Sequence, residues 1–192
     1  MIYTSQIQKA IRFMVKTHEV YQKQKRKGKD VPYLTHPFSV GLILARAGAS
    51  EDVVIAGILH DTIEDSVAEK KVTREMIEER FGTTVADLVE SVTEPDKDLP
   101  WEERKREALE HIKTFNHDSV LLKSADVISN NTELLHDYAD EGDATFERFN
   151  APKEKTIGHT LKVIAALQTA WPESPLAEDL TTLAQSLNKL TA

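Results

Sequence analysis

Apolar residues recur at helical spacing along the first part of the chain. Between Ser5 and about Gln24 they follow one another at steps of three and four residues, which predicts an amphipathic helix. The charged stretch 23–32, which contains glycine and proline, breaks this period and predicts an exposed loop. Thr35-His36-Pro37 is typical of a helix start and Gly48 of a helix end, so a second helix is expected between them.

An almost wholly apolar run, Val53 to Leu59, comes next. Ser50 precedes it and can cap its helix, because a serine hydroxyl accepts a hydrogen bond from a first-turn N–H. A helix without a polar face is expected to be central and deeply buried. We expect the same helix to continue through His60 to Asp65.

Cap residues divide the rest of the chain into further helices. The predicted helices run from Thr73 to Gly82, from Thr83 or Thr84 through Val92, from Trp101 to about Phe115, from Val120 to Leu135, from Pro152 through Leu167 and from Pro175 to near Leu190. The acidic stretch Asp137–Asn150 lacks the helical period and is predicted to be irregular. No segment alternates apolar and polar residues as a strand would, so we predict an all-α bundle of about eight to ten helices in a single domain, 1–192.

The composition narrows the chemistry. The chain has 192 residues, of which 40% are hydrophobic, and no cysteine, so any metal ion must bind nitrogen and oxygen ligands. A formal charge of −8 and a pI near 5.4 argue against a nucleic acid polymer as partner, since the phosphate backbone repels an acidic protein. The longest apolar runs, about eight residues, fall short of the ~20 that span a membrane. We therefore expect a cytoplasmic protein.

Charged residues at helical spacing follow the apolar run. His60 is four residues before Glu64, and Asp61 is four residues before Asp65, so both pairs can face one cavity. Three carboxylates and an imidazole at the end of a buried helix are costly unless a cation or partner compensates them. A solvated helix end with a satisfied histidine is the alternative for the His-Asp pair taken alone.

Two further segments complete an ordered set. They are Tyr33-Leu-Thr-His36-Pro37 and Lys123-Ser-Ala-Asp126-Val-Ile-Ser-Asn130. With these, the sequence resembles the HD-domain superfamily, and more closely the alarmone hydrolases of the RelA/SpoT type and their small single-domain relatives. The resemblance extends from His18 to about Lys155.

The resemblance implies a metal centre. It assigns His36, His60, Asp61 and Asp126 as ligands of a single divalent ion, with the carboxylates of Glu64 and Asp65 beside the attacking water. Two imidazoles and two carboxylates suit Mn²⁺ and would accept Fe²⁺, Zn²⁺ or Co²⁺. The family resemblance favours manganese.

The resemblance also implies a small-molecule nucleotide substrate. Arg26-Lys27 occupies the place of a basic pair that lies against the nucleotide in alarmone hydrolases, although a solvated loop is an equal alternative from the sequence. The other candidate substrate contacts are Tyr33, Asn130, Lys155, His159 and, more weakly, Lys97. Arginine and lysine supply both charge and donors to phosphate groups.

The expected activity is hydrolysis of a phosphorylated nucleotide, most specifically by a guanosine-3′,5′-bis(diphosphate) 3′-pyrophosphohydrolase. Another HD nucleotide or cofactor phosphatase is an alternative, because Asn131 and Thr132 depart from the alarmone-hydrolase pattern. A non-catalytic nucleotide-binding HD module is a third reading, which the presence of both Glu64 and Asp65 disfavours. Exposed apolar residues on the final two helices are compatible with a homodimer.

Overall fold

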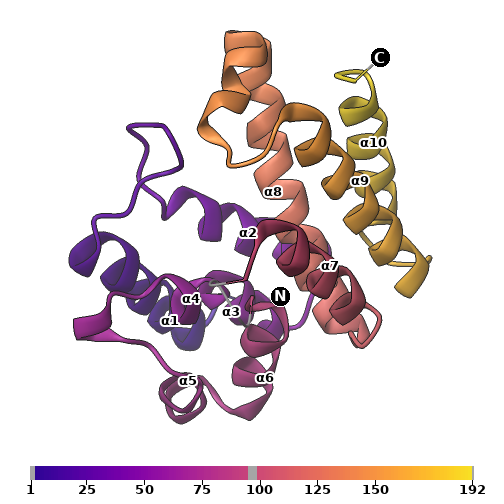
Figure 1. Ribbon diagram of the computed structural model, residues 1–192. Helices are drawn as coiled ribbons and strands as arrows, with labels where there is room; N and C mark the ends of the chain where they lie inside the picture. The colour runs from indigo at the N-terminus through magenta and orange to yellow at the C-terminus, as the bar shows by residue number, and fades with distance from the viewer. Residues whose placement is uncertain (1–2, 95–98, 192) are drawn as a thin grey trace. The chain divides into compact units, whose positions relative to one another are not determined.

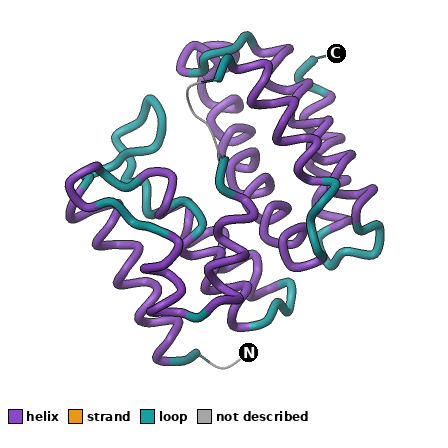
Figure 2. The backbone as a smooth tube through the Cα atoms, turned by 60° about the horizontal axis from the view of Figure 1, so that its bottom comes forward, coloured by secondary structure: helices purple, strands orange, loops and turns teal. Residues whose placement is uncertain are grey.

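The computed structural model describes residues 3–94 and 99–191. Within these ranges the regular structure is helical and contains no β-strand, as the purple helices and teal loops of Figure 2 show. The all-α prediction is confirmed. No helix in the described part of the chain is long and apolar enough to cross a membrane. The chain forms two compact units, Met1–Pro95 and Asp96–Ala192, here called the N-terminal and C-terminal units.

The N-terminal unit carries six α-helices among its described residues, together with two short segments of other helical types (Figure 1). In order they are α1 (Ser5–Val15), a π-helical segment (Lys16–Tyr21), α2 (Thr35–Arg46), α3 (Glu51–Leu59), α4 (Thr62–Asp65), a 3₁₀ segment (Ala68–Lys70), α5 (Arg74–Phe81) and α6 (Thr83–Val92). The loop between the π-helical segment and α2 extends away from both neighbours (Figure 1).

Side-chain caps mark two of the predicted helix starts in this unit. The hydroxyl of Ser50 accepts a hydrogen bond from Val53 N, and the Thr73 hydroxyl accepts one from Met76 N. Gly82 ends α5 at φ 92°, a backbone conformation that costs glycine little. The prediction of a Thr83 or Thr84 cap for α6 is wrong, because Gly82 occupies the N-cap position and Thr83 is already helical.

Helix α3 is the centre of the N-terminal unit. It packs against α1, α2 and α6, and every residue from Val53 to Leu59 is buried. The prediction of a deeply buried apolar helix is therefore confirmed. Burying one large aliphatic side chain contributes about 1.5–3 kcal/mol to the free energy of unfolding, so α3 supplies much of the stability of its unit.

Helix α3 ends earlier than its sequence pattern predicts. It stops at Leu59, His60 and Asp61 form a turn, and a separate four-residue helix, α4, begins at Thr62. His60 Nδ1 is 2.8 Å from the Gly57 carbonyl oxygen, and the Thr62 hydroxyl donates to the Leu59 carbonyl at 2.7 Å. These side chains compete with backbone N–H groups for the last carbonyls of α3, which explains the break.

The C-terminal unit contains four α-helices in its described residues. They are α7 (Trp101–Ile112), α8 (His117–Glu141), α9 (Lys153–Ala170) and α10 (Ala177–Asn188), with a 3₁₀ segment (Gly142–Arg148) between α8 and α9. Helix α8 packs on α9 and α10, and α7 packs on α9. Ile157, Leu167 and Leu187 lie at the centre of the shared core, where they are fully buried.

The stretch Asp137–Asn150 is more regular than predicted. Helix α8 continues through it to Glu141, and the 3₁₀ segment follows directly. One Nη atom of Arg148 lies 3.2 Å from Asp137 and 3.1 Å from Glu141, so the guanidinium holds the end of α8 against the 3₁₀ segment. The acidic residues that suggested an irregular loop thus have a cationic partner.

Candidate metal centre

The first predicted ligand, His36, lies in the first turn of α2. Its backbone N–H donates to the Tyr33 carbonyl at 2.9 Å, which anchors the helix start to the preceding loop. The imidazole is buried, with 3% of the residue exposed. Pro37 follows within the first helical turn, where the missing N–H of proline costs nothing.

The second predicted ligand, His60, lies in the turn that ends α3. Because the Gly57 carbonyl can only accept, the 2.8 Å contact requires a hydrogen on His60 Nδ1. In the neutral ring, Nε2 is then the atom with a lone pair. A histidine whose other nitrogen donates to a carbonyl is the usual arrangement of a metal ligand.

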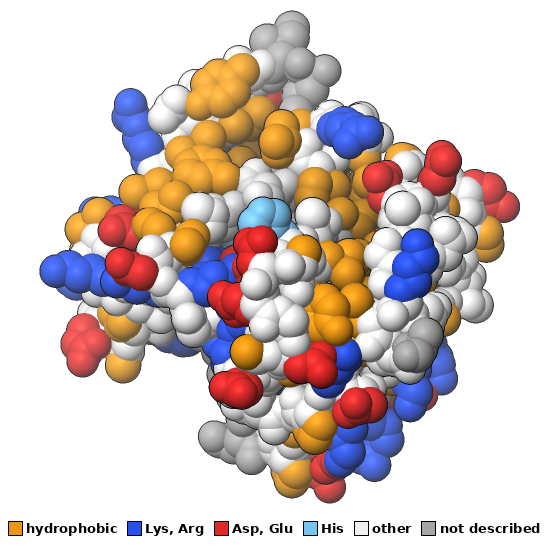
Figure 3. Space-filling model, turned by 90° about the horizontal axis from the view of Figure 1, so that it is seen from above, with side chains coloured by type: hydrophobic (Ala, Val, Ile, Leu, Met, Phe, Trp, Pro, Cys, Tyr) orange, Lys and Arg blue, Asp and Glu red, His pale blue; other side chains and the backbone are white. Residues whose placement is uncertain are grey.

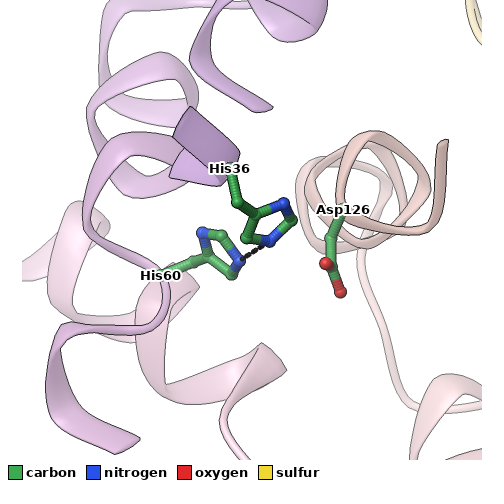
Figure 4. A group of neighbouring side chains, drawn as sticks. All are labelled: His36, His60 and Asp126. Atoms are coloured by element: carbon green, nitrogen blue, oxygen red, sulfur yellow. Dashed lines mark hydrogen bonds between the residues drawn. The ribbon is translucent and has the colours of Figure 1, made fainter. Parts of the chain in front are cut away.

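Three candidate ligand atoms converge in the N-terminal unit. His36 Nε2 lies 3.2 Å from His60 Nε2, and Asp61 Oδ2 lies 3.6 Å and 3.1 Å from these two nitrogens. With bonds of about 2.1 Å, neighbouring ligands of one cation are about 3.0 Å apart in an octahedron and about 3.4 Å apart in a tetrahedron. The three atoms therefore fit one divalent ion. Figure 4 shows the rings of His36 and His60 pointing toward each other.

Tyr33 completes this group. Its hydroxyl donates to Asp61 Oδ2, which is also the carboxylate oxygen nearest both histidines. Burial and the neighbouring Asp61 carboxylate raise the pKa of Tyr33 far above its ordinary value, so the hydroxyl stays protonated and remains a donor. The tyrosine thus fixes the orientation of a candidate ligand.

The fourth predicted ligand, Asp126, lies on α8 in the C-terminal unit, as Figure 4 shows. It is buried, with 9% exposed. Its two oxygens accept hydrogen bonds from Lys123 Nζ at 2.8 Å and from Asn130 Nδ2 at 2.6 Å. All three residues are three or four positions apart on one helix face, which is why they meet.

Glu64 and Asp65 lie on α4, and each carboxylate has a defined partner. Asp65 Oδ2 accepts a hydrogen bond from Gln24 Nε2 at 2.9 Å, and Glu64 Oε2 is 3.4 Å from the backbone N of Glu94. Both residues are partly buried. The helix break at His60 and Asp61 does not remove the second four-residue pairing, since Asp65 N still donates to the Asp61 carbonyl at 2.9 Å.

The predicted substrate contacts lie in both units. In the N-terminal unit the guanidinium carbon of Arg26 is 5.4 Å from the centre of the Tyr33 ring, and Lys27 is exposed. In the C-terminal unit Lys155 forms an exposed ion pair with Glu102, at 2.8 Å, and His159 packs edge-on against Trp101. Lys97 lies outside the described residues.

Three residues near the predicted site, His18, Gln24 and Lys123, were not expected from the sequence. His18 is 99% buried and its Nδ1 is 2.8 Å from Gln24 Oε1, whereas Lys123 forms the ion pair with Asp126 described above. The resemblance begins at His18, but the sequence offers no partner for this ring. The short spacing of Lys123 and Asp126 is the one signal that would have suggested a contact.

Comparison with known proteins agrees with this geometry. The model of the HD domain family matches residues 10–155, which include both histidines, Asp61 and Asp126. The chain belongs to the HD-domain family. A zebrafish (Danio rerio) protein named guanosine-3′,5′-bis(diphosphate) 3′-pyrophosphohydrolase MESH1 is 40% identical to this HD-domain chain over 119 residues, which make up 60% of the chain and 63% of the zebrafish protein.

Two solved structures are similar to this HD-domain protein. The protein lmo0812 of Listeria monocytogenes is 33% identical, with a TM-score of 0.71 over 81% of this chain and 97% of that one. A metazoan ortholog of SpoT, described as hydrolysing ppGpp, has a TM-score of 0.73 over 99% of this chain and 96% of its own, at 23% identity. The second likeness concerns the fold alone.

Proposed function

We propose that this protein is a metal-dependent pyrophosphohydrolase that removes the 3′-pyrophosphate from guanosine-3′,5′-bis(diphosphate). The observation that carries the proposal is the convergence of His36, His60 and Asp61 in a chain of the HD-domain family. A relative 40% identical over 119 residues bears the name of this activity. The chain covers 63% of that relative, so the activity is inferred for the part the two share.

For the metal we propose a single divalent ion, Mn²⁺, with His36, His60, Asp61 and Asp126 as ligands. The distances among the first three support this set, and Asp126 enters through its place in the ordered HD motif. When bound, the ion would act as a Lewis acid that neutralises phosphoryl charge and lowers the pKa of water. Nitrogen and oxygen ligands suit manganese, and the chain has no cysteine that could supply a soft thiolate ligand.

Glu64 and Asp65 are proposed as the catalytic carboxylates. In the reaction, the water oxygen forms a bond to the phosphorus next to the ribose 3′ oxygen, and the bond between that phosphorus and the 3′ oxygen breaks. A carboxylate of this pair accepts the water proton, and a proton passes to the departing 3′ oxygen, so that the products are guanosine diphosphate and pyrophosphate. Proton transfer by a positioned carboxylate contributes roughly 10²–10⁴-fold to such a rate.

In the N-terminal unit we propose that Arg26, Lys27 and Tyr33 contact the nucleotide. The Arg26 guanidinium lies over the Tyr33 ring, whose hydroxyl donates to the proposed metal ligand Asp61, and this placement supports a phosphate-binding role. Lys27 is exposed, so its ammonium group can reach a phosphate in solvent.

In the C-terminal unit we propose that Asn130, Lys155 and His159 contact the substrate. The Asn130 amide donates to Asp126 at 2.6 Å, which places it beside a proposed metal ligand. The ion pair of Lys155 with Glu102 is exposed to solvent and therefore weak, so a phosphate can replace the carboxylate.

We propose that the two units act together as one HD-type domain over residues 1–192, because the family model spans residues 10–155 and so includes parts of both. We also propose a cytoplasmic protein that forms a homodimer. On the face seen in Figure 3 acidic and basic side chains are interspersed, which agrees with a small nucleotide rather than a nucleic acid polymer as partner.

The test is an assay of the purified chain, stripped of metal, with guanosine tetraphosphate in the presence and absence of Mn²⁺. We expect manganese-dependent release of pyrophosphate that is lost in Asp65→Ala. The matched control is Asp52→Ala, an exposed carboxylate in the first turn of α3, which should leave the rate unchanged. Asp61→Asn should weaken Mn²⁺ binding by at least about tenfold in equilibrium dialysis.

Other results would change the conclusion. Release of orthophosphate from other nucleotides would keep a phosphohydrolase and replace the substrate. Tight Mn²⁺ binding without turnover of any nucleotide in a panel would favour a binding module. Equal Mn²⁺ affinity of the wild type and Asp61→Asn would refute the proposed ligand set.

A further inference from the structure

A chain of side-chain hydrogen bonds leads from the π-helical segment to Asp65. His18 Nδ1 lies 2.8 Å from Gln24 Oε1, and Gln24 Nε2 lies 2.9 Å from Asp65 Oδ2. We propose that His18 and Gln24 are positioning residues that hold the Asp65 carboxylate in its reactive orientation. The proposal rests on the function proposed above, in which Asp65 acts on the attacking water.

The direction of each hydrogen bond follows from the chemistry of the groups. An ionised Asp65 only accepts, so the amide nitrogen of Gln24 must face it and the amide oxygen must face His18. That oxygen also only accepts, and His18 must therefore carry a hydrogen on Nδ1. One carboxylate thus determines both the orientation of an amide and the tautomer of a histidine.

The surroundings of His18 agree with this tautomer. The residue is 1% exposed, and its Nε2 has no hydrogen-bond partner among the described residues. Burial lowers the pKa of His18 below its ordinary value, so the ring is neutral near pH 7. A neutral ring with its hydrogen on Nδ1 leaves only a lone pair unsatisfied at Nε2, whereas an imidazolium would bury an unpaired N–H and a charge.

The backbone of Gln24 is hydrogen-bonded as well as its side chain. Its N–H donates to the His18 carbonyl at 2.8 Å, and its carbonyl accepts from Tyr33 N at 2.9 Å. Just before it, Lys23 has φ 49°, a backbone conformation that L-residues rarely adopt. The chain reverses here and brings Gln24 back beside the π-helical segment, a helical type that often occurs at functional sites.

The neighbouring carboxylates of Asp61 and Asp65 therefore both accept hydrogen bonds from the loop between the π-helical segment and α2. The Tyr33 ring packs on the His18 ring with centroids 5.1 Å apart, and its hydroxyl donates to Asp61. Gln24 donates to Asp65, one helical turn further along. Partners that orient residues in contact with a metal or substrate typically change activity by about 10–100-fold when removed.

The first test is kinetic and uses the full chain with Mn²⁺ and guanosine tetraphosphate. Gln24→Met removes both side-chain hydrogen bonds at similar size and should lower kcat by about 10–100-fold with little change in KM. His18→Leu should act in the same direction. His18→Asn should restore most of the rate, because an asparagine Nδ2 can replace the histidine Nδ1 as donor.

The matched control is Thr17→Val. Thr17 is the buried neighbour of His18 in the same segment, and its hydroxyl donates to the Phe13 carbonyl at 3.1 Å. This variant loses one buried hydrogen bond without touching Gln24, so its kcat should equal that of the wild type. An equal loss of rate in Thr17→Val, or failure of His18→Asn to exceed His18→Leu, would mean that the segment matters only for folding.

A second test does not require turnover. Nuclear magnetic resonance of the full chain with diamagnetic Mg²⁺ should find the hydrogen of His18 on Nδ1, and side-chain amide protons of Gln24 that exchange slowly. Asp65→Ala should remove the protection of the Gln24 amide. A hydrogen on Nε2, or an unprotected Gln24 amide in the wild type, would overturn the proposal. If the wild type hydrolyses no guanosine tetraphosphate, the proposed function fails while these signals still decide the contacts.

Discussion

Gly41 and Gly158 offer the same substitution with opposite expected outcomes. Both lie inside helices, in α2 and α9 respectively. A Cβ atom added at Gly41 would lie 2.8 Å from Cγ1 and 3.4 Å from Cδ1 of Ile58 in α3, whereas none would meet an atom within 4 Å at Gly158. Gly41→Ala therefore forces Ile58 or α3 to move, and Gly158→Ala fills open space.

The magnitudes follow from two opposing effects. Alanine in a helix interior is favoured over glycine by about 0.5–1 kcal/mol, because glycine loses more backbone entropy on folding. Overpacking of a well-packed core costs about 1–3 kcal/mol. We expect Gly158→Ala to raise the free energy of unfolding by about 0.5–1 kcal/mol. We expect Gly41→Ala to lower the free energy of unfolding by roughly 0–2.5 kcal/mol, the difference of the two effects.

Urea unfolding followed by circular dichroism measures both changes. Both tryptophans, Trp101 and Trp171, lie in the C-terminal unit. Tryptophan fluorescence therefore follows the unfolding of the unit that contains Gly158 and can be compared with the circular dichroism of the whole chain. Ile58→Ala removes the clashing atoms, so the cost of Gly41→Ala should disappear in the double variant. The reasoning is refuted if Gly41→Ala stabilises as much as Gly158→Ala, or if its cost stays the same beside Ile58→Ala.

Two further predictions concern the helix start and the tyrosine at the site. Ser50→Ala should lower the free energy of unfolding by about 1 kcal/mol through loss of the α3 cap, with Ser50→Asp as the retaining control, and equal thermal midpoints for all three proteins would contradict this. Because the folded-state pKa of Tyr33 is raised, only the unfolded chain releases this proton above about pH 10, so the free energy of unfolding should fall as the pH rises past that value. Tyr33→Phe should weaken this decline, and an unchanged slope in alkaline urea titrations would count against a buried, protonated hydroxyl.

The sequence determined the helices where neighbouring residues decide the structure. Ser50, three residues before the apolar run that starts at Val53, caps α3, and Thr73 caps α5. Such caps act over one helical turn, so they can be recognised without knowing the fold. The burial of Val53 to Leu59 was also predictable from neighbouring residues, because a helix with no polar face has to be covered on all sides.

The sequence was less informative where a side chain competes with the backbone. His60 fits the helical pattern of α3, yet its ring binds the Gly57 carbonyl and the helix ends. Likewise the acidic stretch after Asp137 looked irregular until Arg148 was found between its carboxylates. Both outcomes depend on where a side chain points after packing, which helical periodicity does not encode.

The tertiary structure alone decided which residues meet within the N-terminal unit. The ordered motif named His36 and His60, but their ring nitrogens approach to 3.2 Å because α2 and α3 pack together across 24 positions of sequence. Gln24 and Asp65 are 41 positions apart, and no pattern in the sequence relates them. Their contact depends on the reversal of the chain at Lys23 and on the short α4. Local propensities act over a few residues, whereas such long-range hydrogen bonds form only once loops have closed and helices have packed.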